Sequence, residues 1–176
     1  LEVIGGVYKW LFPANWKFGA ENFLGDDYHG VTTHRSVDLL RISPSGQQGR
    51  HTEDNFQVQA SWFDVSHHGS GRLDFRLDSA DSPYKNMYPA HPSVDRYFRK
   101  MHKERRSRLG KRARLTADNG NIFPNTTQGT YQSICVWHPN GPDSTEVWRW
   151  YWLHRNAPQE VKNLFRHYFM RYGGPA

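Results

Sequence analysis

Hydrophobic residues recur along this chain at two different spacings, one typical of strands and one typical of helices. The order of these stretches predicts a series of helices and strands. Leu73, Phe75 and Leu77 alternate with polar residues, which is the pattern of a strand with one buried face. Over 94–101 the apolar residues recur at helical spacing instead, and basic residues fill the opposite face. The predicted elements are a helix over 14–28, strands over 56–65, 72–78, 129–138 and 145–154, and helices over 94–109 and 156–172. This order predicts an α+β fold in which helices flank an antiparallel sheet.

Turn-forming residues set the expected ends of these elements. Asn15 is the expected N-cap of the first helix, and Gly110 is expected to end the basic helix. Pro158 is expected in the first turn of the last helix, whose apolar stripe is predicted to consist of Val161, Leu164, Phe165, Tyr168 and Phe169. Segment 139–143, which contains two prolines and an Asn-Gly pair, is typical of a hairpin between the last two strands. The run 67–71, two histidines followed by Gly-Ser-Gly, favours a surface turn.

Composition and charge narrow the class of protein. No run approaches the roughly 18 apolar residues that cross a bilayer, and the start resembles no secretory signal. The single cysteine, Cys135, excludes an internal disulfide and a cysteine-based zinc or iron–sulfur site, and its place in an apolar strand favours a buried thiol. Much of the net charge of +6 lies in 96–114. The missing initiator methionine and the turn-like end at 173–176 favour a segment of a longer chain.

The most specific chemistry lies in 22–34, which contains two histidines, two aspartates and two glycines. On a helix Asp26 and His29 share a face, and an acid beside a ligating imidazole fixes its tautomer. His29 and His34 are about 140° apart on a straight helix, so one metal ion can bind both only if the helix breaks between them. Gly30 and the β-branched residues after it supply such a break. Spacing alone leaves open one core histidine and one surface histidine.

The residues around this segment resemble a known signature. Asn15-Trp16-Lys17, followed by Glu-Asn-Phe-x-Gly-Asp-x-Tyr-His-x4-His over 21–34, is similar to the iron-binding motif of the large (alpha) subunit of Rieske-type aromatic ring-hydroxylating dioxygenases. Further stretches resemble that family in the same order: 121–125, 136–139, 145–148, 157–158 and 174–176. The resemblance identifies 1–176 as a partial catalytic domain, although 35–115 carries no aligned motif.

The resemblance implies roles for three residues at the metal. His29 and His34 would be the two imidazole ligands of a mononuclear Fe(II), which this family holds with two histidines and one carboxylate. Asp26 would be the bridging acid that links the iron to a Rieske cluster on a neighbouring subunit. The third ligand is expected beyond Ala176. The Cys-x-His and Cys-x-x-His pairs of a Rieske domain are absent from this sequence.

The resemblance also implies a pocket and a fold. Asn22 and Phe23 would lie beside the iron and bind the substrate, and Asn119 would face the same pocket. The catalytic domain of this family has a helix-grip (Bet v 1-like) fold, which in this chain would be incomplete at the C-terminus. The isolated piece is therefore expected to be inactive.

For the complete subunit the resemblance implies an oxygenase. Electrons from NAD(P)H would pass through a ferredoxin or reductase and a [2Fe-2S] Rieske cluster, and both atoms of O2 would enter an arene to give a cis-dihydrodiol. Monohydroxylation and demethylation share this iron site and stay open. The expected partners are neighbouring alpha subunits (alpha3 or alpha3beta3), a small beta subunit and the electron donors, in the bacterial cytoplasm. Segment 138–142 is similar to that of actinobacterial enzymes acting on polycyclic arenes or phthalate.

A different class of function is compatible with the charge pattern. A basic module could hold nucleic-acid phosphates with Arg105, Arg106 and Arg108 while aromatic rings stack on bases. A solvated helix face, or a docking surface for an acidic ferredoxin or sister subunit, is the favoured interpretation of this helix. The alternating indoles in 148–152 favour a core or pocket wall over a stacking platform.

Overall fold

The computed structural model describes residues 1–23, 33, 36, 39–40, 60–64, 69–73, 88–110, 120–122, 124–129 and 132–173. These residues belong to two compact units. The first unit contains the strands and α1 (Trp16–Asn22). The second contains α4 (Pro92–Leu109), α5 (Gln159–Tyr168) and a short π-helical segment, η3 (Phe169–Gly173).

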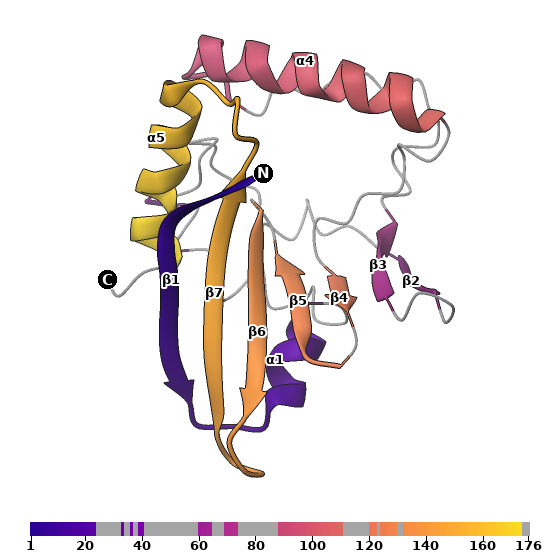
Figure 1. Ribbon diagram of the computed structural model, residues 1–176, viewed down its shortest axis with the longest axis vertical. Coiled ribbons are helices and arrows are strands. Elements are labelled where there is room, and N and C mark those ends of the chain that lie inside the picture. Colours follow the sequence, from indigo (N-terminus) through magenta and orange to yellow (C-terminus); the bar gives the residue numbers. More distant parts are fainter. Residues whose placement is uncertain are drawn as a thin grey trace. The chain divides into compact units, whose positions relative to one another are not determined.

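Strands of the first unit form one antiparallel sheet, in which seven strands are described. Along the sheet the order is β1-β7-β6-β5-β4-β3-β2, so the N-terminal strand pairs with the strand that comes last in sequence (Figure 1). The strands are β1 Glu2–Phe12, β2 Ala60–Asp64, β3 Gly69–Leu73, β4 Gly120–Ile122, β5 Thr126–Gly129, β6 Ser133–Pro139 and β7 Thr145–Leu153.

One face of this sheet, the inner face, carries the core of the first unit. Successive side chains of a strand point to opposite sides, and directly paired residues share a side. Cys135, Trp137 and Val147 form a buried cluster on the inner face. Apolar side chains of β1, of α1 and of the residue directly after α1 pack against this cluster: Trp10, Phe12, Trp16 and Phe23. The helix α1 therefore covers the inner face of the sheet.

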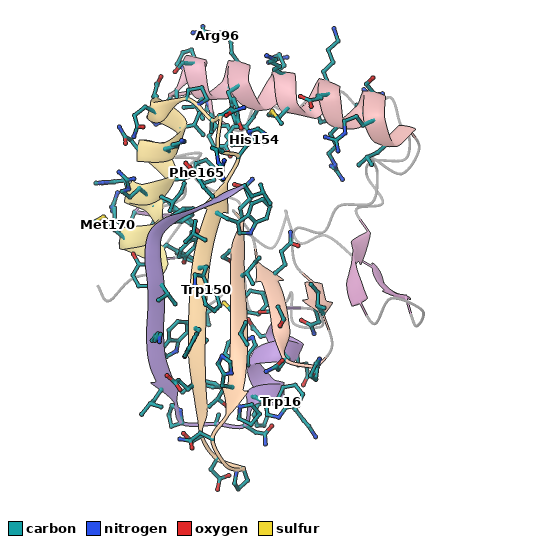
Figure 2. All side chains as sticks on the ribbon, viewed as in Figure 1. Trp16, Arg96, Trp150, His154, Phe165 and Met170 are labelled. Atoms are coloured by element: carbon teal, nitrogen blue, oxygen red, sulfur yellow. The ribbon has the colours of Figure 1, made fainter. Side chains whose placement is uncertain are left out.

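The opposite, outer face is aromatic and less buried. Trp148, Trp150 and Trp152 alternate with the buried residues of β7 and are themselves only partly buried (Trp150 is labelled in Figure 2). The Lys9 ammonium lies 3.6 Å from the ring centroid of Trp148, a cation–π contact. These three indoles do not belong to the buried cluster, so of the two predicted positions, core or pocket wall, the core position is not observed.

In the second unit aromatic side chains join the two helices. Rings of Tyr88 and Phe98 stack with centroids 4.8 Å apart, and Phe98 lies 5.6 Å from Phe165 of α5. The hydroxyl of Ser93 on α4 donates a hydrogen bond to the carboxylate of Glu160 on α5. The apolar stripe predicted for the last helix packs this way, with Val161, Phe165, Tyr168 and Phe169 all buried.

Much of the predicted layout is confirmed. The α+β class, the basic helix ending at Gly110, the hairpin between β6 and β7, and the last helix are all present. Pro158 is the N-cap of α5, one residue before the first turn in which it was expected. Cys135 is buried and free, as expected for a structural thiol. Among the described helices, none combines the length and the apolar character that crossing a membrane requires.

Two boundaries differ from the prediction. The helix expected over 14–28 is shorter than predicted: α1 begins at Trp16 and ends at Asn22. The turn expected at 67–71 is partly strand, since Gly69, Ser70 and Gly71 belong to β3. Backbone pairing explains the second difference, because β3 pairs with β2 on one side and with β4 on the other, and these bonds need no side chains.

Two further differences concern strands that hydrophobic periodicity missed or merged. The strand β1 was not predicted, because Gly5 and Gly6 interrupt its alternation; both have positive φ, 79° and 86°, where the β1–β7 register shifts. The segment 121–125 resembles a single family strand, but β4 ends at Ile122, and Pro124 and Asn125 lie in the turn before β5.

Candidate functional site

The N-cap residue of α1 connects this helix, which precedes the motif residue Phe23, to the β6–β7 hairpin. The Asn15 side chain accepts a hydrogen bond from the Lys17 backbone N–H at 3.1 Å, the expected N-cap arrangement. The same side chain donates to the carbonyl of Pro142 in the β6–β7 turn at 3.0 Å. The cap therefore orients α1, whose last residue is Asn22.

Phe23, which follows α1 directly, lies on the inner face of the sheet. Its ring is 6.1 Å from the ring of Trp137, and Gly129 of β5 lies beneath it. A Cβ on Gly129 would come within 2.6 Å of both the Phe23 ring and the Ser133 hydroxyl. Glycine at this position therefore makes room for the phenyl ring of Phe23.

Asn121 is a polar residue of this site that sequence reasoning did not assign. Its side chain donates a hydrogen bond from Nδ2 to the carbonyl of Ala20 in α1, at 2.8 Å. Its Oδ1 is buried and has no hydrogen-bond partner among the described residues. This oxygen is thus an acceptor at the junction of α1 and β4. The nearby Asn119, expected to face the pocket, lies outside the described residues.

The three residues expected at the metal also lie outside the described residues, namely Asp26, His29 and His34. Within the described part of the chain, no three His, Cys, Asp or Glu side chains are grouped closely enough to hold a metal ion. The helix α1 ends before Asp26, so the predicted helix-face contact between Asp26 and His29 has no support from this helix.

The donor chemistry of the segment nevertheless fits Fe(II). Two imidazoles and a carboxylate, with positions left open, are the ligands that non-haem iron takes in oxygenases, and this segment contains the two imidazoles of such a set. Further along, the Leu40 N–H donates to the Ser36 carbonyl at 3.0 Å, which is a helical hydrogen bond.

A second polar group on the inner face surrounds Arg149 of β7; the arginine cluster is Arg149, Cys135, Tyr151 and Trp10. The guanidinium Nε donates to the Cys135 sulfur at 3.1 Å, and the guanidinium carbon lies 4.9 Å from the Trp10 ring centroid. Burial disfavours the charged form, whereas the Cys135 and Tyr151 side chains favour it, and the balance raises the pKa of Arg149 above its ordinary value.

Sequence reasoning missed the arginine cluster because its members come from three strands. Trp10 lies on β1, Cys135 on β6, and Arg149 and Tyr151 on β7. Only the pairing of β1 with β7, and of β7 with β6, brings these residues together. The sequence contains one indication of this cluster: Arg149 is a charged residue at a position that strand alternation assigns to the inner face.

The fold and the motif together define a class of protein, and comparison with known families agrees. The family model described as "Ring hydroxylating alpha subunit (catalytic domain)" matches residues 3–171. The chain therefore belongs to the ring-hydroxylating alpha-subunit family, and the match covers its catalytic domain.

Named relatives are alpha subunits of aromatic dioxygenases. The chain is 34% identical over 179 residues to the biphenyl dioxygenase subunit alpha of Paraburkholderia xenovorans, and 32% identical over 186 residues to the biphenyl 2,3-dioxygenase subunit alpha of Rhodococcus jostii. It is 30% identical over 179 residues to the benzene 1,2-dioxygenase subunit alpha of Pseudomonas putida. These alignments cover 96–97% of the chain and only 37–38% of the relatives.

Solved structures show the same fold. The chain superimposes on naphthalene 1,2-dioxygenase with indole bound in the active site, with a TM-score of 0.72, 23% identity, and coverage of 99% of this chain and 39% of the other. For the naphthalene 1,2-dioxygenase of a Rhodococcus species bound to indole, the TM-score is 0.60 at 22% identity, covering 97% and 39% of the two chains. The expected catalytic-domain fold is confirmed.

Proposed function

We propose that this chain is catalytic-domain sequence of an aromatic ring-hydroxylating dioxygenase alpha subunit, which inserts both atoms of O2 into an arene to give a cis-dihydrodiol. One observation carries the proposal: a family match over 3–171 that contains the complete motif Glu-Asn-Phe-x-Gly-Asp-x-Tyr-His-x4-His. The packing of Phe23 over Gly129 supports it, because this places a motif residue on the inner face of the sheet.

The residues of this chain have distinct roles in the proposal. His29 and His34 would hold a mononuclear iron, which would supply the dioxygen-activating chemistry when bound. Asp26 would link that site to a neighbouring subunit, whose Rieske cluster would supply NAD(P)H-derived electrons when bound. Phe23 presents an apolar ring edge to the arene, and Asn22 and Asn119 border the same pocket. Binding of the arene by apolar contacts excludes water from the reacting ring.

Iron content of the full-length subunit that contains this chain tests the ligands. We expect about one mononuclear iron per subunit, in addition to the cluster iron, and its loss in both His29→Ala and His34→Ala. His167→Ala is the matched control, because His167 is an exposed imidazole on α5. Normal mononuclear iron in both ligand variants would refute the proposal.

Electron transfer tests Asp26 separately. In Asp26→Asn we expect both the mononuclear iron and the Rieske cluster to remain, and the cluster to be reduced by its donor at the normal rate. Product formation should nevertheless fall by at least about tenfold, because the link between the two centres is lost. Cluster absorbance in stopped flow and product yield measure the two steps, and equal product yields in the variant and wild type would remove Asp26 from this role.

Product analysis decides the reaction type. Turnover of an arene with the electron-donor proteins should give a cis-dihydrodiol that carries two oxygen atoms from labelled O2. A phenol or a demethylated product would place the subunit with the monooxygenases of the same family.

A further inference from the structure

The inner face of β7 has one position that is not fully buried, and an arginine occupies it. Thr145, Val147, Tyr151 and Leu153 are buried along this face, whereas Arg149 between them is only partly buried. A cation is thus set into a mostly apolar face of the strand. Such a position is costly for a charge unless an anion or a set of acceptors lies beside it.

The described neighbours of Arg149 supply little negative charge. Its Nε–H is used by the Cys135 sulfur, the Tyr151 side chain also forms a hydrogen bond with the guanidinium, and the Trp10 ring lies 4.9 Å from the guanidinium carbon. Burial raises the pKa of Tyr151, an effect that Arg149 opposes, so this phenol stays neutral near pH 7. None of the described carboxylates pairs with Arg149. The guanidinium has five N–H donors in a planar fork, and this fork matches a carboxylate in a bidentate pair.

Sheet register places Arg149 near the expected substrate pocket. Gly129, which makes room for Phe23, pairs with Ser133, and Ser133 pairs with Tyr151, two residues from Arg149. The separation between Gly129 and Arg149 is about 10 Å across the sheet and about 7 Å along it. Both residues are on the inner face, and an arginine side chain together with an aromatic acid can bridge such a separation.

We propose that Arg149 binds the carboxylate of an aromatic acid, so that the preferred substrate of this subunit is an aryl carboxylate rather than an uncharged arene. The inference rests on the proposed function and deepens it. Apolar contacts at Phe23 hold the ring, and the guanidinium holds the carboxylate, which selects the substrate by charge and fixes which ring carbons face the site of oxidation. Trp10 and Cys135 hold the guanidinium in place for this contact.

Ligand binding without turnover is the first test. The full-length subunit is titrated under anaerobic conditions with phthalate, 1-naphthoate and the uncharged naphthalene, and tryptophan fluorescence is recorded, because Trp10 lies against the guanidinium. We expect the two acids to bind more tightly than naphthalene. In Arg149→Gln their affinity should fall by about 10- to 100-fold while that of naphthalene is unchanged. Arg149→Lys should restore part of the affinity, since it returns the charge without the fork.

Lys9→Gln is the matched control, because Lys9 is a cation on the neighbouring strand that lies on the outer face against Trp148. Its acid affinity should equal that of the wild type. Acids and naphthalene binding equally well to the wild type would overturn the proposal, as expected if a carboxylate of the protein itself neutralises Arg149. A uniform loss of affinity for all three ligands in both Arg149 variants would also overturn it, since that indicates a structural role.

Turnover separates this inference from the proposed function. In the wild type we expect a higher kcat/KM for the acids than for naphthalene, and in Arg149→Gln a raised KM for the acids with unchanged mononuclear iron. Tight acid binding that depends on Arg149, without any iron-dependent product, would support the carboxylate site and refute the oxygenase function. Efficient turnover of naphthalene with rejection of both acids would support the oxygenase function and refute the carboxylate site.

Discussion

Gly19 of α1 lies directly against the indole of Trp137. A Cβ built at this position would overlap the six-membered part of the Trp137 ring, with one ring atom at 2.6 Å. Trp137 cannot easily yield, because it is buried and its Nε1–H donates to the Thr127 hydroxyl at 3.0 Å. At an open helical position, replacing glycine by alanine would instead stabilise by about 1 kcal/mol.

At the residue scale, Gly19→Ala should therefore reverse the usual sign of this substitution. Overpacking costs about 1–3 kcal/mol, so we expect the free energy of unfolding to fall by about 1–2 kcal/mol, measured by urea denaturation. The matched background is Trp137→Phe, which removes the overlapping ring atoms, and there Gly19→Ala should cost clearly less. Equal costs in the two backgrounds would show that the ring overlap is not the cause.

At the scale of the element, the cap of α1 has two hydrogen bonds that can be separated. Asn15→Ala removes the acceptor for the Lys17 N–H and the donor to the Pro142 carbonyl, so it should destabilise by about 1–2 kcal/mol. Asn15→Asp keeps the acceptor and places a negative charge at the helix N-terminus, and it should cost less than half as much. Lys17→Ala is the control, since it keeps the backbone N–H. Thermal unfolding of the three variants measures the order, and an Asp variant as unstable as the Ala variant would assign the effect to the hairpin bond.

The elements also show which parts of the secondary structure could be predicted from the sequence. Helical spacing of apolar residues predicted α4 and α5, because one face of each helix packs through apolar side chains. These are Val94 and Phe98 in α4, and Val161 and Phe165 in α5. The strand β1 was missed because Gly5 and Gly6 interrupt its alternation at a register shift. The first three residues of β3 were missed because Gly69 and Gly71 pair through the backbone, which leaves no pattern in hydrophobicity. Local periodicity therefore predicts elements with an unbroken alternation of side chains and fails where glycines interrupt a strand or form it.

For the whole molecule, the family motif identified site residues without locating them in space. Gly129, Trp137 and Arg149 surround the end of α1 or share its sheet face, yet no spacing in the sequence links them to Phe23. Their proximity follows from the antiparallel order of β5, β6 and β7. A sequence pattern can therefore indicate the chemistry of such a site, whereas the residues that we propose select the substrate come together only through strand pairing.

Stability against acid is a property of the whole molecule to which His102 of α4 contributes. Burial first, and then the positive charges of Arg106 and Arg105, lower the pKa of His102 from its ordinary value of 6.5. Below pH 6.5 the unfolded chain therefore binds this proton more readily than the folded chain. The contribution of His102 favours the folded state least at low pH, so stability falls as the pH drops from about 6.5 through the folded-state pKa.

His102→Gln should remove this contribution and flatten the loss of stability below pH 6.5, while leaving stability at pH 7.5 nearly unchanged. Arg106→Gln should flatten it partly, because one of the two neighbouring charges is removed. Urea midpoints measured from pH 7.5 to pH 5 for the three proteins give the slopes, and the other titrating groups cancel in the differences. If the urea midpoint of His102→Gln changed with pH as steeply as that of the wild type, neither burial nor the basic residues of α4 would lower the pKa of this imidazole.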